Sequence, residues 1–332
     1  MAKKVTLIPG DGITRELVEP VLGILEAAGA EVEFEEQQAG RAAFEATGRS
    51  FPDATLASIV ENKVALKGKV LTPRDDKYET PASMLRKRLE LFASVRPIRN
   101  LRGLVGRHKD VDIVLIREST EDVYAGLEHH VRPDVVSSMK VVTTRGSERI
   151  ARYAFEYARS RGRKKVTLIH KANIMKKTDG LFIESASKVA AEYSDVAFET
   201  LIVDNACMQL MLRPHRYDVV LAGNLYGDIF GDLGGGIVGG ISATLGALFN
   251  DELAVFEAIH GEAEHLMGKG VANPLPLLLP ACWMLEHLGQ KAVGDTIMRA
   301  ASDTLEAGVK TADLGGTANT AEFCRAIIDR LG

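Results

Sequence analysis

Two aspartates spaced four residues apart are the first candidates for chemistry in this chain. Asp228 and Asp232 lie in residues 224–232, a segment with a helical pattern, so both carboxylates are expected on one helix face. Two like charges held side by side repel each other unless a cation or a basic group lies between them, and a hard divalent ion such as Mg²⁺ or Mn²⁺ suits such oxygen ligands. Taken alone, however, such a pair is more often a solvated acidic surface than a metal site.

Length and composition narrow the classes of function. The 332 residues are 46% hydrophobic and carry a net charge of −4, which predicts a globular protein with two lobes and without the broad cationic surface that nucleic acid or an anionic membrane needs. No apolar run has membrane-spanning length, and Lys3 and Lys4 lead into a strand pattern instead of the apolar core of a signal peptide. Three scattered cysteines without a CxxC pair indicate buried thiols. We therefore expect a cytoplasmic protein that acts on a small molecule.

Short β-branched runs alternate with longer helical patterns, which is typical of an α/β protein with a mainly parallel sheet. The expected strands are residues 4–8, 30–35, 112–117, 165–170, 198–203 and 218–222, and the clearest helices are residues 14–28, 147–161 and 180–193. Thr14 is expected to cap the first helix. Residues 234–239 match the pattern G-x-G-x-x-G but follow a helical segment instead of a strand, so we interpret these glycines as a site of close helix packing or a turn.

Six longer motifs occur in order along nearly the whole chain. They are residues 8–13, 91–97, 117–126, 170–176, 224–232 and 268–274. Together they closely resemble the β-decarboxylating dehydrogenases, the family of isocitrate, 3-isopropylmalate, homoisocitrate and D-malate dehydrogenases. The resemblance implies an isopropylmalate dehydrogenase-like, two-lobed α/β fold with a mainly parallel, non-Rossmann sheet. It further implies a large cofactor-binding domain of residues 1–95 and 245–332 and a small domain of residues 96–244 that carries a dimer interface.

The chemistry of this family assigns roles to five residues. Its members pass the C2 hydride of a 2-hydroxy acid to a nicotinamide and then lose the carboxylate β to the new ketone, with Mg²⁺ or Mn²⁺ stabilising the charges that develop. The resemblance implies that Asp228 and Asp232 are metal ligands and that Asp204 is contributed across the interface of a homodimer. It also implies that Lys171 accepts the hydroxyl proton and that Tyr124 protonates the enolate carbon.

The resemblance also identifies candidate substrate-binding residues. Three arginines match the family's carboxylate-binding positions, for which a planar guanidinium is well suited. They are Arg86, Arg96 and Arg117. Residues 121–128 resemble the isocitrate branch, but where that branch presents Ser-x-Asn to the distal carboxylate, this chain has Thr80 and Ala82, and an alanine cannot donate a hydrogen bond. Residues 121–128 make isocitrate the first expectation, and the missing distal contact makes the longer homoisocitrate the second. 3-Isopropylmalate is the third, because the apolar lining expected for it is absent.

NAD is the expected cofactor. A Lys-Tyr pair that would bind the 2′-phosphate of NADP in this family is replaced by His265 and Leu266. Glu262 and Glu264 would accept hydrogen bonds from ribose hydroxyls and repel a phosphate, whereas a protonated His265 would attract one. The expected cofactor-binding residues are Thr72, His260, Gly261, Glu262, Ala263, Glu264, His265, Leu266 and Asn273.

The sequence thus predicts a homodimeric, NAD-dependent, metal-requiring enzyme that oxidises and decarboxylates isocitrate to 2-oxoglutarate and CO₂. A different functional class, the non-catalytic regulatory subunit, stays open as an alternative. Some members of the family are regulatory subunits of hetero-oligomers, and Ala82 departs from the catalytic pattern. The presence of Tyr124, Lys171 and all three aspartates favours the catalytic interpretation.

Overall fold

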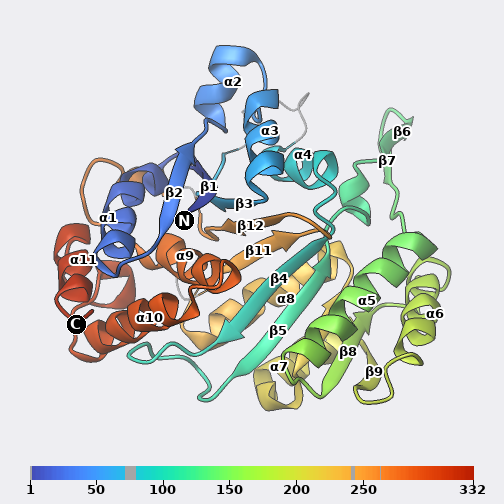
Figure 1. Ribbon diagram of the computed structural model, residues 1–332. Coiled ribbons are helices and arrows are strands. Elements are labelled where there is room, and N and C mark those ends of the chain that lie inside the picture. The colour runs from blue at the N-terminus through green and yellow to red at the C-terminus, as the bar shows by residue number, and fades with distance from the viewer. Residues whose placement is uncertain (1, 72–79, 241–243, 262) are drawn as a thin grey trace. The chain divides into compact units, whose positions relative to one another are not determined.

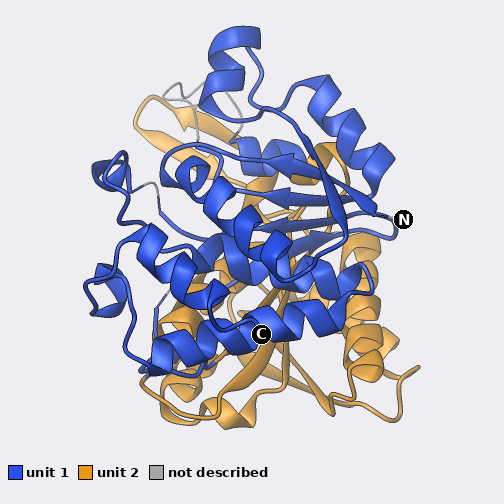
Figure 2. Ribbon diagram, turned by 60° about the vertical axis from the view of Figure 1, so that its left-hand side comes forward, with its two compact units in different colours: residues 1–85, 100–106, 238–332 blue, residues 86–99, 107–237 orange. Residues whose placement is uncertain are grey.

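The computed structural model describes residues 2–71, 80–240, 244–261 and 263–332, which form two compact units (Figure 2). Unit 1 contains residues 1–85, 100–106 and 238–332, and unit 2 contains residues 86–99 and 107–237. The chain therefore passes between the units more than once. The roles predicted for the two domains, cofactor binding and dimerisation, stay predictions.

The strands of unit 1 follow the order β2-β1-β3-β12-β11 (Figure 1). They are β1 (Lys3–Ile8), β2 (Val32–Glu36), β3 (Val64–Lys67), β11 (Gly246–Phe249) and β12 (Ala254–Glu257). Neighbouring strands are parallel except for the antiparallel pair β11–β12. The helices are α1 (Ile13–Ala27), α2 (Arg41–Thr47), α3 (Asp53–Asn62), α9 (Leu275–His287), α10 (Lys291–Glu306) and α11 (Thr320–Ile328), and α4 (Pro81–Arg88) leads into unit 2.

Helix α9 lies in the centre of the core of unit 1. Its first ten residues from Leu275 to Met284 are almost all buried, so it is apolar all round, as expected for a helix enclosed by other elements. Trp283 packs edge to face on Phe256 of β12, with ring centroids 5.5 Å apart. None of the helices in the described part of the chain combines the length and the apolar character needed to cross a membrane.

The strands of unit 2 follow the order β4-β5-β10-β8-β9. They are β4 (Ala93–Arg99), β5 (Asp112–Glu118), β8 (Lys165–His170), β9 (Ala197–Ile202) and β10 (Val219–Ala222), and only β4 runs antiparallel to its neighbour. The helices are α5 (Thr144–Ser160), α6 (Thr178–Ala190), α7 (Val203–Leu212) and α8 (Asn224–Val238). A separate hairpin of β6 (Glu128–Arg132) and β7 (Val135–Ser138) projects from the unit (Figure 1).

The predicted α/β class with a mainly parallel sheet is confirmed, and each expected strand lies within two residues of an observed one at both ends. The prediction that Thr14 caps the first helix is wrong. Helix α1 already begins at Ile13, after Gly12, so Thr14 lies inside its first turn. Its buried hydroxyl instead contacts Nε2 of His260 at 2.7 Å.

Three glycines on one face of α8 allow this helix to lie close to β4 and β5. Gly227, Gly231 and Gly234 follow the spacing of one helix face. A Cβ atom at Gly227 would lie 2.5–2.9 Å from three side-chain carbons of Arg117, and one at Gly231 would lie 3.0 Å from Nη1 of Arg96. The close helix packing predicted for the glycine segment is thus observed at Gly234, but the packing face begins two turns earlier.

Gly234→Ala tests this close packing, with Gly236→Ala as its matched control. A Cβ at Gly234 would lie within 3.2 Å of three side-chain carbons of the buried Ile98, whereas one at Gly236 would have no neighbour within 4 Å. We expect Gly234→Ala to lower the free energy of unfolding by about 1–3 kcal/mol through overpacking. Gly236→Ala should raise it by up to about 1 kcal/mol through helix propensity. Equal urea midpoints for the two variants would contradict this account.

Candidate active site

Two strands place Arg96 and Arg117 beside each other. In the antiparallel pair β4–β5, Arg96 lies opposite Leu115 and Ser94 lies opposite Arg117. Residues opposite each other and residues two apart share a face, so the two arginines are diagonal neighbours on one side of the sheet. Arg117 is only 1% exposed, and a buried guanidinium needs a compensating negative charge.

Helix α8 supplies that charge. Asp228 forms a close ion pair with Arg117, and Nη2 of Arg96 lies 3.2 Å from the same carboxylate. Nη1 of Arg96 reaches Asp232 at 3.0 Å. The prediction that both aspartates share one helix face is therefore confirmed, and the basic group between them is the guanidinium of Arg96.

Tyr124 completes this cluster from a short 3₁₀ turn, Val123–Ala125. Its hydroxyl donates a hydrogen bond to Oδ2 of Asp228 at 2.6 Å. Burial, together with this bond and the negative charge of Asp228, raises the pKa of Tyr124 to about 12. The phenol is therefore protonated at neutral pH and can donate a proton.

The ionisation of Asp228 is set by opposing effects. Burial disfavours its charged form, but the charge of Arg117, the hydrogen bond from Tyr124 and the charges of Arg96 and Arg86 together hold its pKa below the usual value. Burial and the neighbouring charge of Arg86 lower the pKa of Arg117 to about 10 despite the attraction of Asp228. Both groups are thus charged at neutral pH.

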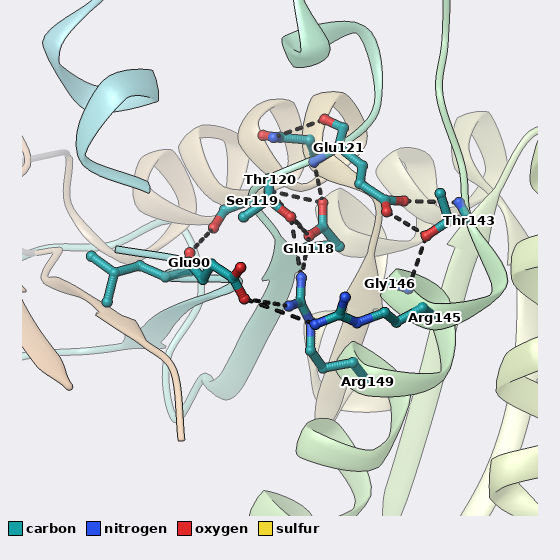
Figure 3. A network of polar contacts seen from close by, with 11 residues as sticks. Glu90, Glu118, Ser119, Thr120, Glu121, Thr143, Arg145, Gly146 and Arg149 are labelled. Atoms are coloured by element: carbon teal, nitrogen blue, oxygen red, sulfur yellow. Dashed lines mark hydrogen bonds and ion pairs between the residues drawn. The ribbon is translucent and has the colours of Figure 1, made fainter. Parts of the chain in front are cut away.

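The segment between Arg117 and Tyr124 is fixed by a network of polar contacts (Figure 3). The carboxylate of Glu118 accepts hydrogen bonds from the backbone and the hydroxyl of Thr120. Glu121 accepts a hydrogen bond from the backbone amide of Thr143, at the start of α5, at 2.9 Å. Burial raises the pKa of the Glu118 carboxyl. The network ties the residues before Tyr124 to α5.

Lys171 and Asp204 form a second charged pair. Lys171 directly follows β8, and Asp204 lies in the first turn of α7, directly after β9. Because β8 and β9 are parallel with His170 opposite Ile202, the two side chains emerge side by side and form a close ion pair. The hydrogen bond from Lys171 lowers the pKa of Asp204. The described residues contain no group of three or more His, Cys, Asp or Glu side chains placed to hold a metal ion.

The predicted substrate residues at and near α4 differ in exposure. Arg86 is buried, whereas Thr80 and Ala82 are exposed. The hydroxyl of Thr80 accepts a hydrogen bond from the backbone amide of Ser83 at 3.4 Å. The residues that replace the Ser-x-Asn pattern therefore lie at the exposed start of a helix.

The predicted cofactor residues lie in unit 1, apart from Thr72 and Glu262, which fall outside the described residues. Nδ1 of His260 contacts the carbonyl oxygen of Gly261 at 2.6 Å, and burial lowers the pKa of its ring. Asn273 accepts a hydrogen bond from the amide of Leu275 at 3.0 Å. The remaining predicted residues include Ala263, with a φ of 45°, and the 3₁₀ turn Glu264–Leu266 that contains His265.

Sequence reasoning missed a cation at this loop. Arg41, at the start of α2, forms an ion pair of 3.0 Å with Glu264. The carboxylate that was expected to repel a phosphate is therefore partly neutralised. No motif marked Arg41, because more than 220 residues separate the two partners in the sequence.

Asp228→Asn tests the charge compensation of Arg117, with Asp232→Asn as the matched control. In the presence of a chelator, Asp228→Asn should lower the free energy of unfolding at pH 7 by about 1–3 kcal/mol, less than for a fully buried pair because this side chain is 37% exposed. Asp232→Asn should lower the free energy of unfolding by only about 0–1 kcal/mol, because the side chain of Asp232 is 64% exposed.

The pH dependence of the Asp228→Asn effect gives a further check. Because the pKa of Asp228 is lower in the folded state, its stabilisation is present above its unfolded pKa of about 3.9 and is lost as the pH falls through the folded value. The difference from wild type in urea unfolding should therefore narrow below about pH 4. A difference that stays constant down to about pH 3 would contradict the assignment.

Comparisons with known proteins agree with the motifs. Residues 4–329 match the model of the family "Isocitrate/isopropylmalate dehydrogenase". The chain is 44% identical over 330 residues to isocitrate dehydrogenase [NAD] catalytic subunit 6 of Arabidopsis thaliana, with 99% of this chain and 88% of the relative covered. It is 43% identical over 331 residues to a regulatory subunit of the Dictyostelium discoideum enzyme, with 98% and 90% covered. The crystal structure of isocitrate dehydrogenase from Methylococcus capsulatus superposes with a TM-score of 0.94 at 43% identity, covering 100% of this chain and 99% of that one.

These relatives correct one prediction. The Arabidopsis and Dictyostelium proteins are named as mitochondrial, which contradicts the cytoplasmic location predicted from the sequence. Net charge and cysteine spacing are properties of the folded domain, whereas the compartment of a protein is determined by targeting signals, which these properties do not reveal. The predicted resemblance itself is confirmed: this chain belongs to the isocitrate/isopropylmalate dehydrogenase family.

Proposed function

We propose that this chain is a catalytic NAD-dependent isocitrate dehydrogenase that produces 2-oxoglutarate and CO₂ with the help of a divalent metal. The observation that carries the proposal is the hydrogen bond between Tyr124 and Asp228, next to the ion pairs of Asp228 with Arg96 and Arg117. This arrangement joins a proton donor, a carboxylate ligand and two carboxylate-binding cations in one cluster. The names of the relatives, which include catalytic NAD-dependent subunits, support the choice of substrate and cofactor.

The proposed metal ligands fit a hard cation such as Mg²⁺ or Mn²⁺. Asp228 and Asp232 present carboxylate oxygens from one helix face, and such ions prefer oxygen ligands. The third ligand would be Asp204 of the partner subunit. When bound, the metal polarises the hydroxyl and the adjacent carboxylate of the substrate.

The protein's own groups bind the substrate and move its protons. Arg86, Arg96 and Arg117 bind the substrate carboxylates through paired hydrogen bonds. Lys171 accepts the proton of the C2 hydroxyl, and Tyr124, protonated at neutral pH, delivers a proton to the carbon that loses CO₂. Because Lys171 is paired with Asp204 and not with Asp228, the partner that supplies Asp204 would supply the lysine as well.

A second copy of the chain is the proposed partner. Unit 2 has large apolar side chains that are at least 37% exposed in and beside the β6–β7 hairpin and on α7 and α8. They are Leu127, Val131, Val136, Met139, Met208, Leu212, Leu225 and Ile229. A partner that covered these side chains would be stabilised by their burial, and the two helices involved carry Asp204 and Asp228. A homodimer in which these residues are covered would complete each site with groups from both chains.

NAD is the proposed cofactor, bound by the loop from His260 to Leu266 together with Thr72 and Asn273. Neither residue of the phosphate-binding Lys-Tyr pair is present, and relatives at 41–45% identity are named as NAD-dependent. Homoisocitrate remains the second substrate, because Ala82 offers no hydrogen bond to the distal end of isocitrate. 3-Isopropylmalate remains the third, because the apolar lining expected for it is absent. A regulatory role is the alternative in another class, since both kinds of subunit occur among the relatives.

Turnover assays with purified protein test this proposal. Isocitrate, homoisocitrate, 3-isopropylmalate and D-malate are each supplied with NAD⁺ or NADP⁺, and the reduced cofactor is followed. We expect the highest kcat/KM with isocitrate and NAD⁺, its loss on metal chelation and its recovery with Mg²⁺ or Mn²⁺. A greater kcat/KM with homoisocitrate would overturn the substrate choice. The absence of metal-dependent turnover for all four substrates would leave the regulatory role.

Hybrid dimers test whether the site is shared between two chains. Tyr124→Phe and Lys171→Gln should each be nearly inactive alone. Random pairing after co-expression makes about half of the dimers mixed. If each site takes Tyr124 from one chain and Lys171 from the other, a mixed dimer has one intact site out of two. About a quarter of wild-type activity should therefore return. Co-expression of Tyr124→Phe with Asp228→Asn is the matched control, because both residues belong to one half-site and no activity should return. Equal activity in the two mixtures would refute the shared site.

A further inference from the structure

Asp122 has an unusual backbone conformation just before the catalytic turn. Its φ of 72° and ψ of −152° fall in a region that is accessible almost only to glycine, and other residues there persist only where surrounding contacts enforce them. The residue is 3% exposed. A glycine would adopt this conformation without strain, so the side chain must make contacts that compensate for it.

The carboxylate of Asp122 joins two elements of the site. One oxygen accepts a hydrogen bond from the backbone amide of Val123 at 2.8 Å and so caps the turn that carries Tyr124. The other accepts one from the amide of Leu225, in the first turn of α8, at 3.3 Å. An ordinary capping aspartate bonds only to its own turn, whereas this one also holds the helix that carries Asp228.

The close approach is prepared by the neighbouring residues. A Cβ at Gly223, the residue before α8, would lie 3.0 Å from Oδ2 of Asp122. The backbone amide of Asp122 donates to the carbonyl oxygen of Val141 at 2.9 Å, which fixes the other side of the residue. Asp122 is therefore held between the segment after β7 and the start of α8.

The same carboxylate continues into a chain of buried charges. Nζ of Lys140 lies 3.6 Å from Oδ2 of Asp122 and 2.6 Å from Oδ1 of Asp179. The other oxygen of Asp179 accepts a hydrogen bond from the backbone amide of Lys171 at 2.6 Å. The side chains of Asp122, Lys140 and Asp179 are at most 13% exposed. One buried path thus runs from the turn of Tyr124 to the backbone of Lys171.

We propose that Asp122 is a positioning residue for the proton donor: its carboxylate clamps the Tyr124 turn to the start of α8, so that the phenol stays on Asp228. This inference rests on the proposed isocitrate dehydrogenase function. Asp122 acts through Tyr124 and does not touch the substrate itself. Loss of the clamp frees the turn to move, and displacement of a catalytic group by about 1 Å is enough to lower a rate about a hundredfold.

Asp122→Gly tests the clamp, because glycine keeps the backbone conformation and removes both side-chain hydrogen bonds. We expect kcat for isocitrate to fall by about 10- to 100-fold, with KM within about threefold of wild type. The melting temperature should stay close to that of wild type, since glycine also relieves the strain. Asp110→Gly is the matched control: Asp110 also has a positive φ, of 57°, but is exposed, and its replacement should leave kcat unchanged. A kcat within twofold of wild type for Asp122→Gly would overturn the proposal.

A double variant separates positioning from general structural damage. In a Tyr124→Phe background the donor is already absent, so adding Asp122→Gly should lower kcat by less than about threefold, far less than in wild type. Losses that multiply in the double variant would show that Asp122 acts independently of Tyr124 and would refute the clamp. Should Asp122→Gly fail to fold, Asp122→Asn replaces it, since asparagine is close to aspartate in size but keeps only one acceptor oxygen.

Hydrogen exchange provides a readout that does not need activity. The amides of Val123 and Leu225 donate to Asp122, so peptides that contain them should exchange faster in Asp122→Gly than in wild type, while peptides of α5 should not change. Inactive wild-type protein would refute the proposed function and leave this comparison intact. Unchanged exchange at both amides would overturn the clamp even in an active enzyme.

Discussion

The buried positive charge of Arg117 is the constraint on which the rest of this site depends. Its guanidinium is almost completely removed from water at the end of β5, and a buried charge without a partner costs several kcal/mol. Only a carboxylate brought close to the strand can compensate for it, and Asp228 does so from α8. The glycine at position 227 is what lets the helix come so near. The position of Tyr124, which bonds to the same carboxylate, follows from the same pairing.

The two charged clusters obey one topological rule. In parallel sheets, functional groups gather beyond the carboxyl ends of the strands. Arg117 lies at that end of β5, α8 begins just after β10, Lys171 follows β8 and Asp204 follows β9, and these four strands run parallel to one another. The strand order therefore distributes the site along one edge of unit 2, with the arginine–aspartate cluster and the lysine–aspartate pair at separate positions. The proposed dimer would draw the arginine–aspartate cluster from one chain and the lysine–aspartate pair from the other.

Local pattern was sufficient for much of this structure, and its failures have physical reasons. The shared face of Asp228 and Asp232 followed from spacing alone. The strands followed from β-branched runs, of which β5, β8 and β10 prove to be almost fully buried, whereas β2 and β9 are only partly buried. Asp122 was not singled out, because its importance lies in a backbone conformation and in a contact with Leu225, about a hundred residues away. The pairing of Arg41 with Glu264 was missed for the same reason. Contacts between distant segments leave no periodic signal in the sequence, whereas helix faces and strands do.

The glycine face of α8 also bears on how this enzyme can change over evolutionary time. The glycines of α8 pack against Arg96, Arg117 and Ile98. They alternate along the helix with Asp228 and Asp232, which pair with the same two arginines, so the same few turns determine both the packing and the charge pairing. A larger side chain at a packing position would displace both carboxylates together. A substitution in this helix would therefore lower the stability of the fold and, under the proposed function, also the activity. If the proposed substrate site is right, new substrate preferences have more freedom to arise at the exposed start of α4, where Thr80 and Ala82 lie, because a change there leaves the packing of α8 and the buried charge of Arg117 unaltered.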